Sequence, residues 1–278
     1  MKQNVDFVFF GTPEFSAIVL DELAAAGYLP SLIITAPDRP VGRKQVVTSP
    51  AVKVWADEHA IECWQPEKPK DIIENLKERT TEVFIVASYG YLLPQTILDI
   101  PQKGVLNVHT SLLPRYRGAS PIESAILNGD TETGSTIMEM TLGMDEGPII
   151  AQSRVPIGSE TTKPALFDIL AHDGGRLLAE TLPRYLSGDI IPTPQDDTLA
   201  TYATKIEKSD GDITNDDDQT RWRKYRAYYG WPGVFLWNGD ARLKITNARY
   251  EGDTFIIEKV IPAGSNEIDY QTYLAKKS

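Results

Sequence analysis

Short apolar runs alternate with helical patterns along roughly the first 190 residues. Runs typical of buried strands cover residues 5–11, 32–34, 83–87 and 104–108. After the first run, apolar positions recur at helical spacing, and a helix is predicted from Pro13 to a stop at Gly27. Because strands alternate with helices, the pattern predicts a parallel sheet in an α/β domain.

Later segments extend this pattern. Residues 51–59, 70–79 and 164–186 are predicted to be helical, and 134–140 with 149–155 to be a further pair of strands. Residues 37–50 hold three prolines, one glycine and three basic side chains, so we predict a loop there.

The pattern changes again near residue 187. Glycine, prolines and aspartates mark residues 188–205 as a linker. Beyond it, the chain is rich in Trp and Tyr, with short β-like runs at 233–237, 241–246 and 254–261. We therefore predict an α/β domain at 1–187, a linker at 188–205 and a small β-rich domain at 206–278.

In open α/β sheets, ligands bind outside the carboxyl ends of the strands. This rule places residues 11–12, 88–90 and 109–111 at the functional edge. Asn107 and His109 project to the same face, because side chains alternate along a strand. An amide donor and an imidazole then converge on one point, although each residue alone is also typical of a satisfied polar group near a sheet end.

Composition excludes several classes of protein. The chain has 278 residues, one cysteine and three histidines, so it has neither an internal disulfide nor a recognisable metal-ligand spacing, and we predict no metal. G-x-G-x-x-G, P-loop and G-x-S-x-G motifs are absent. No stretch of 18 apolar residues and no export signal is found, which predicts no membrane association and a cytoplasmic location.

The net charge of −11 disfavours nonspecific coating of nucleic acid. Residues 1–205 carry −10 of it and residues 206–278 only −1. Two basic clusters stand out locally: Arg39, Arg43 and Lys44, and the group Arg221, Arg223, Lys224 and Arg226 around Trp222 and Tyr225. Either cluster is also compatible with a solvated face, and the second with pairing to the aspartates at 216–218.

Residues 107–118, Asn-Val-His-Thr-Ser-Leu-Leu-Pro-Arg-Tyr-Arg-Gly, continue into Ala-Ser-Pro-Ile at 119–122. This segment resembles the signature of the folate-dependent formyltransferases. The resemblance implies a Rossmann-like catalytic domain and a catalytic set of Asn107, His109 and Asp145, the last within Met144–Gly147. On sequence alone, the acid between two glycines at 143 and 147 is also typical of a hairpin turn. Arg115 and Arg117 either guide substrate or pin their own loop.

Further segments resemble the branch of this family that acts on methionyl-tRNA. They are residues 9–15, 37–44, 87–90, 92–94, 201–206 and 231–232. Two segments depart from that branch: residues 146–152 resemble the ribonucleotide branch, and the tail after Asn238 is shorter than an OB-like barrel. The resemblance therefore implies an abbreviated OB-like second domain.

The resemblance implies formyl transfer from 10-formyltetrahydrofolate to the α-amine of initiator methionyl-tRNA by a monomer. The implied folate-site residues are Ser111, Leu112, Leu113, Pro114, Tyr89, Gly90 and Leu92. The implied tRNA contacts are Arg39, Arg43, Lys44, Arg221 and Arg223. The alternatives are an amino-sugar N-formyltransferase that acts on a nucleotide-linked sugar and a catalytically inert RNA-binding relative.

Overall fold

The computed structural model describes residues 5–42 and 44–276, and these form two compact units. The first unit draws on residues 1–117, 133–155 and 168–202, and the second on 118–132, 156–167 and 203–278, as far as each range is described. Both units are discontinuous in the sequence. The consecutive segments 1–187, 188–205 and 206–278 therefore stay a prediction.

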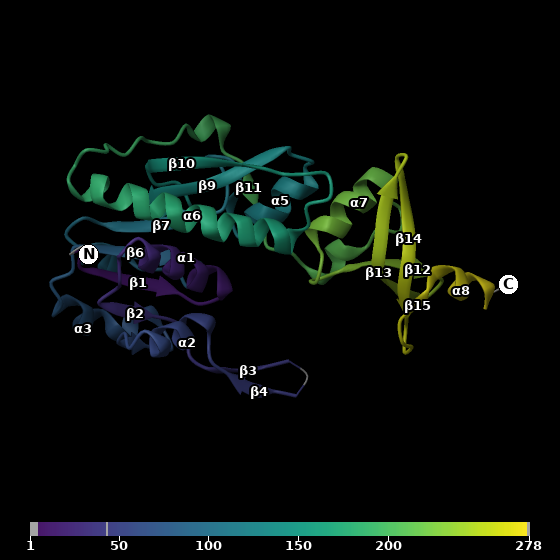
Figure 1. Cartoon of the computed structure of the whole chain (residues 1–278), viewed down its shortest axis with the longest axis horizontal. Coiled ribbons are helices and arrows are strands. Elements are labelled where there is room, and N and C mark those ends of the chain that lie inside the picture. The colour runs from purple at the N-terminus through teal and green to yellow at the C-terminus, as the bar shows by residue number, and fades with distance from the viewer. Residues whose placement is uncertain (1–4, 43, 277–278) are drawn as a thin grey trace. The chain divides into compact units, whose positions relative to one another are not determined.

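A seven-stranded sheet forms the centre of the first unit (Figure 1). In spatial order its strands are β10 (Ile149–Pro156), β9 (Glu132–Glu139), β7 (Val105–His109), β6 (Val83–Ala87), β1 (Phe7–Gly11), β2 (Leu32–Ile34) and β5 (Cys63–Trp64). The pairs from β7 through to β5 are parallel, whereas β9 runs antiparallel to β7. The predicted Rossmann-like α/β fold is confirmed, with an antiparallel extension on one side.

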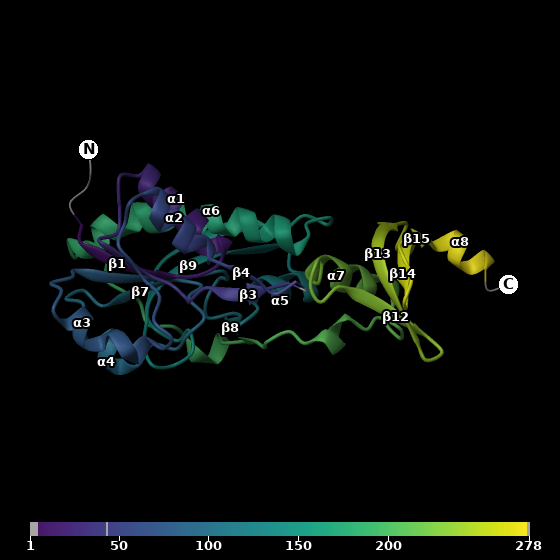
Figure 2. The ribbon, with the colours of Figure 1, turned by 90° about the horizontal axis from the view of Figure 1, so that it is seen from below.

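Helices cover both faces of this sheet (Figure 2). One face carries α1 (Glu14–Ala25), α2 (Ala51–Glu58) and α6 (Lys163–Leu186). The other face carries α3 (Ile73–Lys77), which follows the short turn η1 (Pro69–Ile72), and α4 (Gln95–Leu98). Because both faces are covered, β1, β2 and β6 are buried along their whole length and carry no polar side chain, as the continuous runs predicted.

The core on the α3 and α4 face uses alternate residues of four parallel strands. Strand side chains in this cluster are Val8, Phe10, Leu32, Ile34, Phe84, Val86 and Val105. Leu76 of α3 and Ile97 of α4 are fully buried against them. Tyr89 and Leu93, from the loop after β6, join the same cluster, so this loop is tied to the core at its base.

Residues 37–50 are a hairpin, and the prediction of a loop was wrong. Strand β3 (Arg39–Val41) pairs antiparallel with β4 (Val46–Thr48), so that Arg39 lies opposite Thr48. The β-branched residues of β4 favour extended backbone, and Pro40 is tolerated because a two-stranded ribbon has only edge strands. Arg43 lies outside the described residues.

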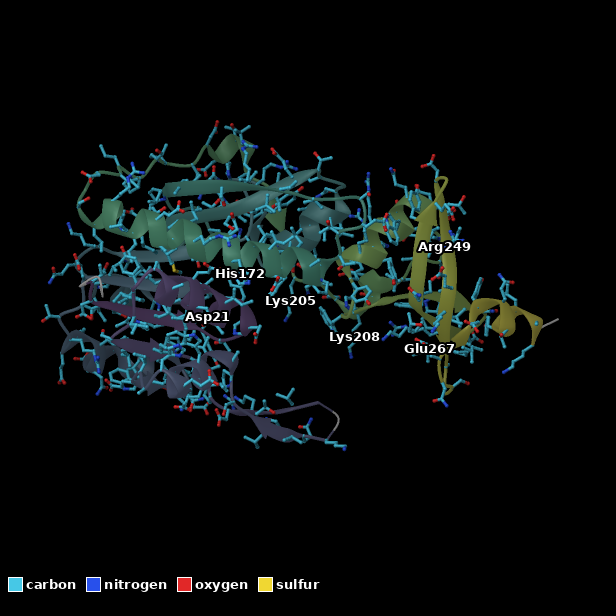
Figure 3. All side chains as sticks on the ribbon, viewed as in Figure 1. Asp21, His172, Lys205, Lys208, Arg249 and Glu267 are labelled. Atoms are coloured by element: carbon cyan, nitrogen blue, oxygen red, sulfur yellow. The ribbon has the colours of Figure 1, made fainter. Side chains whose placement is uncertain are left out.

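The second unit contains a four-stranded antiparallel sheet. It is formed by β12 (Val234–Asn238), β13 (Ala241–Glu251), β14 (Thr254–Pro262) and β15 (Ile268–Asp269), in that order. Arg249 of β13, labelled in Figure 3, pairs with Glu258 of β14 at 3.1 Å. The β-rich second region is confirmed, and in the described residues its sheet is open, with β12 and β15 as the two edges.

Helices complete the second unit. They are α5 (Pro121–Leu127), α7 (Asp218–Ala227) and α8 (Tyr270–Ala275), together with the turn η3 (Lys208–Gly211). Trp222 of α7 stacks on Tyr225 of the same helix and on Tyr250 of β13, with ring centroids 5.5 and 6.0 Å apart. This aromatic layer gives a small unit more buried apolar area per residue. No described helix has the length and apolarity needed to cross a membrane.

Two isoleucines test whether the α4 face supports the first unit. Ile97→Ala removes a side chain with no solvent exposure, so we expect a loss of about 2–5 kcal/mol in the free energy of unfolding. Ile169→Ala, on the 43% exposed position of α6, is the matched control and should cost less than about 1 kcal/mol. Urea denaturation of both variants provides the measurement, and equal losses would contradict the assignment of this core.

Candidate active site

Along one face of β7, the residues change from apolar core side chains to polar side chains of the candidate site. Val105 is buried in the apolar cluster, and Asn107 and His109 are the next two positions on the same face. Neighbouring strands fix the register: Asn107 lies opposite Val86 of β6 and Met138 of β9, and His109 lies opposite Thr136. The predicted convergence of the amide and the imidazole on one face thus follows from the pairing of three strands.

Both nitrogens of the His109 ring face oxygen atoms. Nε2 lies 3.0 Å from the backbone carbonyl oxygen of Tyr116, which can only accept, so Nε2 carries a proton. Nδ1 lies 3.7 Å from the Asp145 carboxylate. The ring is 6% exposed. Only a ring with a proton on each nitrogen presents an N–H to both acceptors.

Asp145 comes to His109 on the loop that follows β9. Because β9 is antiparallel to β7, Glu139 at its end pairs with Leu106, near the start of β7. The loop at 140–148 therefore runs back alongside β7 to bring Asp145 to the histidine. Asp145 has a φ of +52°, a left-handed conformation that is uncommon for a residue other than glycine. Such strain persists only where the surroundings hold it in place, and it gathers at functional sites.

The same loop depends on two glycines. A Cβ on Gly147 would lie 1.8 Å from the backbone oxygen of Glu139, and one on Gly143 would overlap the Glu146 carboxylate. The loop is therefore a close-packed turn, and Gly147 tolerates no side chain because backbone atoms oppose it. The segment joins the neighbouring strands β9 and β10, so it is also the hairpin connection that the other interpretation predicts. Its aspartate in addition faces His109.

The segment after β7 is held by its own hydrogen bonds. The Ser111 hydroxyl donates to the carbonyl of Arg115 at 2.6 Å, and the Ser111 carbonyl accepts from Thr136 Oγ1 at 2.6 Å. Gln152 Nε2 donates to the Leu113 carbonyl at 2.9 Å. The Leu113–Pro114 peptide is cis. This backbone presents the Tyr116 carbonyl to His109.

The expected folate-site residues differ in accessibility. Ser111 and Leu113 are buried, and Leu112 and Pro114 are half-buried. Leu92 is 88% exposed, and Gly90 has a φ of +86° with open space where a side chain would stand. From the loop after β9, Leu142 and Met144 are also exposed. Large apolar side chains in water are costly, and on two loops beside the site they suit an apolar ligand.

Tyr89 is in the core rather than on the surface. Its ring is 3% exposed and meets Phe10 edge-on at 5.4 Å, and burial raises the pKa of its phenol. Its hydroxyl is nevertheless buried without a hydrogen-bond partner among the described residues. An orphaned hydroxyl costs about 1–3 kcal/mol, and because Tyr89 is buried in the core it supports the base of its loop rather than lining an open site.

Sequence reasoning missed Gln195, which lies in the segment predicted to be a linker. Its amide Nε2 donates to the backbone carbonyls of Asp145 at 2.8 Å and Gly147 at 2.7 Å. No local pattern marks this glutamine, because its partners are 48 and 50 residues away. Of the two alternatives for Arg117, the structure supports pinning, since the side chain is 2% exposed.

The first basic cluster lies on the β3–β4 hairpin. Lys44 is exposed in its turn, and the valines at 41, 46 and 47 are more than half exposed. Arg39 forms an ion pair with Glu67, and this hydrogen bond raises the pKa of its guanidinium. The hairpin therefore offers an exposed lysine and apolar side chains, with Arg39 already partnered.

Local pairing occupies much of the second cluster. Arg221 pairs with Asp218 at 3.1 Å, and Lys224 with Asp216 at 2.8 Å, as the alternative interpretation predicts. Arg226 is 7% exposed, and its guanidinium lies over the Trp222 ring. The guanidinium of Arg223 packs closely over Gly129. These contacts stabilise α7, and a tRNA role for Arg221 and Arg223 stays a prediction.

The remaining histidines have structural partners. His172 of α6, labelled in Figure 3, lies 2.6 Å from Glu22 of α1. His59 stacks on Trp55 with centroids 3.8 Å apart. Among the described residues, no group of three or more His, Cys, Asp or Glu side chains is arranged to hold a metal ion.

Known proteins with similar sequences are formyltransferases. Residues 3–182 match the family model described as formyl transferase. A methionyl-tRNA formyltransferase from Halalkalibacterium halodurans is 42% identical over 84% of this chain and 74% of its own length. Another, from Listeria monocytogenes, is 38% identical over 96% of this chain and 94% of its own.

Solved structures share the fold. The methionyl-tRNA formyltransferase from Clostridium thermocellum superimposes with a TM-score of 0.61 at 16% identity, covering 93% of this chain and 98% of that one. An N-formyltransferase from Helicobacter canadensis, in complex with folinic acid and dTDP-3-aminofucose, gives 0.67 at 17% identity, covering 91% and 95%. The fold alone thus does not separate acceptors, but the sequence matches identify the group: the chain belongs to the formyl transferase family, and its similarity to methionyl-tRNA formyltransferases extends over most of its length.

Proposed function

We propose that this protein transfers the formyl group of 10-formyltetrahydrofolate to the α-amine of initiator methionyl-tRNA. The observation that carries the proposal is the meeting of Asn107, His109 and Asp145, drawn from two segments, beside exposed apolar loops. The similarity to methionyl-tRNA formyltransferases supports methionyl-tRNA as the acceptor. We also propose that the protein acts in the cytoplasm as a monomer.

Asn107 supplies a neutral hydrogen-bond donor. When the amine nitrogen attacks the formyl carbon, a C–N bond forms and the carbonyl oxygen becomes an oxyanion. An amide N–H held on a strand needs no reorganisation to meet that charge. One preorganised donor of this kind contributes about 3–4 kcal/mol to the transition state.

His109 and Asp145 supply charge and a route for protons. The imidazolium form, which satisfies both Tyr116 and Asp145, places positive charge beside the developing oxyanion. As the tetrahedral intermediate collapses, the bond from carbon to N10 of the folate breaks, N10 gains a proton and the amine loses one. Asp145 accepts the amine proton directly or through one water, and the same proton is passed on to N10. The formyl group is transferred without a covalent enzyme intermediate.

The donor fits the two loops beside β7. Leu92, Leu142 and Met144 offer apolar contact for a flat pterin. The buried residues Ser111 and Leu113 shape the backbone rather than touch the ligand. In our proposal, Leu112 and Pro114 complete the wall.

Recognition of the tRNA is assigned to the hairpin. Lys44 at its turn would contact phosphates, as would its neighbour in the sequence, Arg43, and the exposed valines would pack on sugar or base faces. Since the chain as a whole carries a charge of −11, these contacts are local and sensitive to salt. On binding, Arg39 would break its ion pair with Glu67 and form one with a phosphate of the tRNA.

An assay of acceptors tests the function. Purified protein with 10-formyltetrahydrofolate is offered charged initiator tRNA, or an amino-sugar nucleotide, in separate reactions. We expect formyl transfer to the methionyl-tRNA alone. Transfer only to the sugar would establish the amino-sugar alternative, and tRNA binding without any transfer would establish an inert RNA-binding protein.

Alanine substitutions test the three site residues. Asn107→Ala, His109→Ala and Asp145→Ala should each lower kcat by about 10²–10³-fold, because each removes charge stabilisation or proton transfer in the transition state. Circular dichroism should show a retained fold. Asn75→Ala, at an exposed position of α3, is the matched control and should keep full activity. Near-normal turnover in the three site variants would refute the assignment.

Charge removal tests the hairpin. Arg43→Ala and Lys44→Ala should raise KM for methionyl-tRNA and flatten its salt dependence, since each removes about one phosphate contact. KM for 10-formyltetrahydrofolate should stay unchanged. Lys77→Ala on α3 serves as the control. A parallel rise in both KM values would place these side chains in the folate site instead.

A further inference from the structure

Arg117 is a buried cation at the centre of a polar network in the first unit. It follows Tyr116 in strand β8 (Arg117–Gly118), which pairs with β11 (Tyr202–Ala203). Its Nε and one terminal nitrogen donate to Gln195 Oε1 at 3.0 and 2.8 Å, and that terminal nitrogen also reaches Asp197 at 2.7 Å. Burial lowers the pKa of this guanidinium, but hydrogen bonds with Asp197 and Tyr202 outweigh it and leave the pKa raised. The cation is therefore permanent.

Gln195 links Arg117 to the Asp145 loop through hydrogen bonds. Its oxygen is held by Arg117, so its amide group has one orientation, and both amide hydrogens point at backbone carbonyls of the loop. They meet Asp145 at 2.8 Å and Gly147 at 2.7 Å. The donors and the acceptor of one side chain are thus all engaged between a buried cation and the strained residue that faces His109.

The same stretch of chain also secures the other partner of His109. The amide N–H of Tyr116 donates to Thr201 Oγ1 at 2.9 Å, and the amide of Arg117 donates to the Thr201 carbonyl at 2.9 Å. Tyr116 has a φ of +60° and presents its carbonyl to His109 Nε2. Residues 195–201, which include the turn η2 (Asp197–Leu199), therefore brace both acceptors of the imidazole.

We propose that Gln195, locked by the buried Arg117, is a positioning residue that sets the Asp145 carboxylate against His109 for the transfer step. It touches no reacting atom and acts through the backbone of Asp145. The inference rests on the proposed function, since Asp145 must take part in formyl transfer. A displacement of about 1 Å at such a group costs about 10²-fold in rate.

Gln195→Glu isolates this role. The carboxylate keeps the length of the side chain and its pairing with Arg117, but it has no N–H for the two carbonyls and places negative charge against them. We expect kcat with methionyl-tRNA to fall about 10–100-fold. Gln195→Met, which lacks donors and adds no charge, should give a similar loss. Gln102→Glu, at an exposed turn of the first unit, is the matched control.

A double-mutant cycle distinguishes positioning from general stability. In an Asp145→Asn background, Gln195→Glu should cause little further loss of kcat, because its effect passes through the carboxylate that is already gone. Independent losses that multiply would overturn the proposal. So would wild-type kcat in both Gln195 variants.

Hydrogen exchange gives a readout that needs no turnover. Amides at 142–147 should exchange faster in Gln195→Glu than in the wild type, while amides of β1 and β6 keep their protection. Unchanged exchange in the loop would overturn the proposal even if activity fell. If the wild type transfers no formyl group to methionyl-tRNA, the proposed function fails, whereas the exchange result still decides whether Gln195 holds the loop.

Discussion

The side chain of Arg117 is almost wholly removed from water. Its N–H donors therefore need hydrogen-bond acceptors within the protein, and the fold of the first unit must supply them. Its partners come from residues 195–202, so the chain returns to the catalytic sheet after the long helix α6. One acceptor, Gln195, also binds the loop of Asp145. The need of the buried Arg117 for hydrogen-bond acceptors thus also fixes the position of Asp145, the acid that faces His109.

The sheet contributes the other half of the site. Along one face of β7, the apolar Val105 gives way to Asn107 and His109, so the polar pair stands at the border of a rigid core. β6 and β9 flank this strand and fix its register. Site residues on packed strands keep their positions more closely than residues on free loops, which suits the role that we propose for Asn107 and His109 in stabilising a developing charge.

Positive charge is used differently in the two units. In the second unit, Arg221, Lys224 and Arg226 are taken up by aspartates, backbone carbonyls and an aromatic ring, and they hold α7 in place. On the β3–β4 hairpin, Lys44 and three valines are exposed instead. The same residue types therefore stabilise a helix in one place and leave a surface open to a polyanion in the other.

By itself the sequence determined the strands at 32–34 and 83–87, the helix at 164–186 and the shared face of Asn107 and His109, because local periodicity encodes these features. Family resemblance added Asp145. Only the tertiary structure decided that residues 39–48 pair as a hairpin, and that the loop after β9 returns along β7 to reach His109. It alone decided that Gln195 joins Arg117 to Asp145, since contacts across 50 and 78 residues depend on how the chain folds back and leave no local pattern.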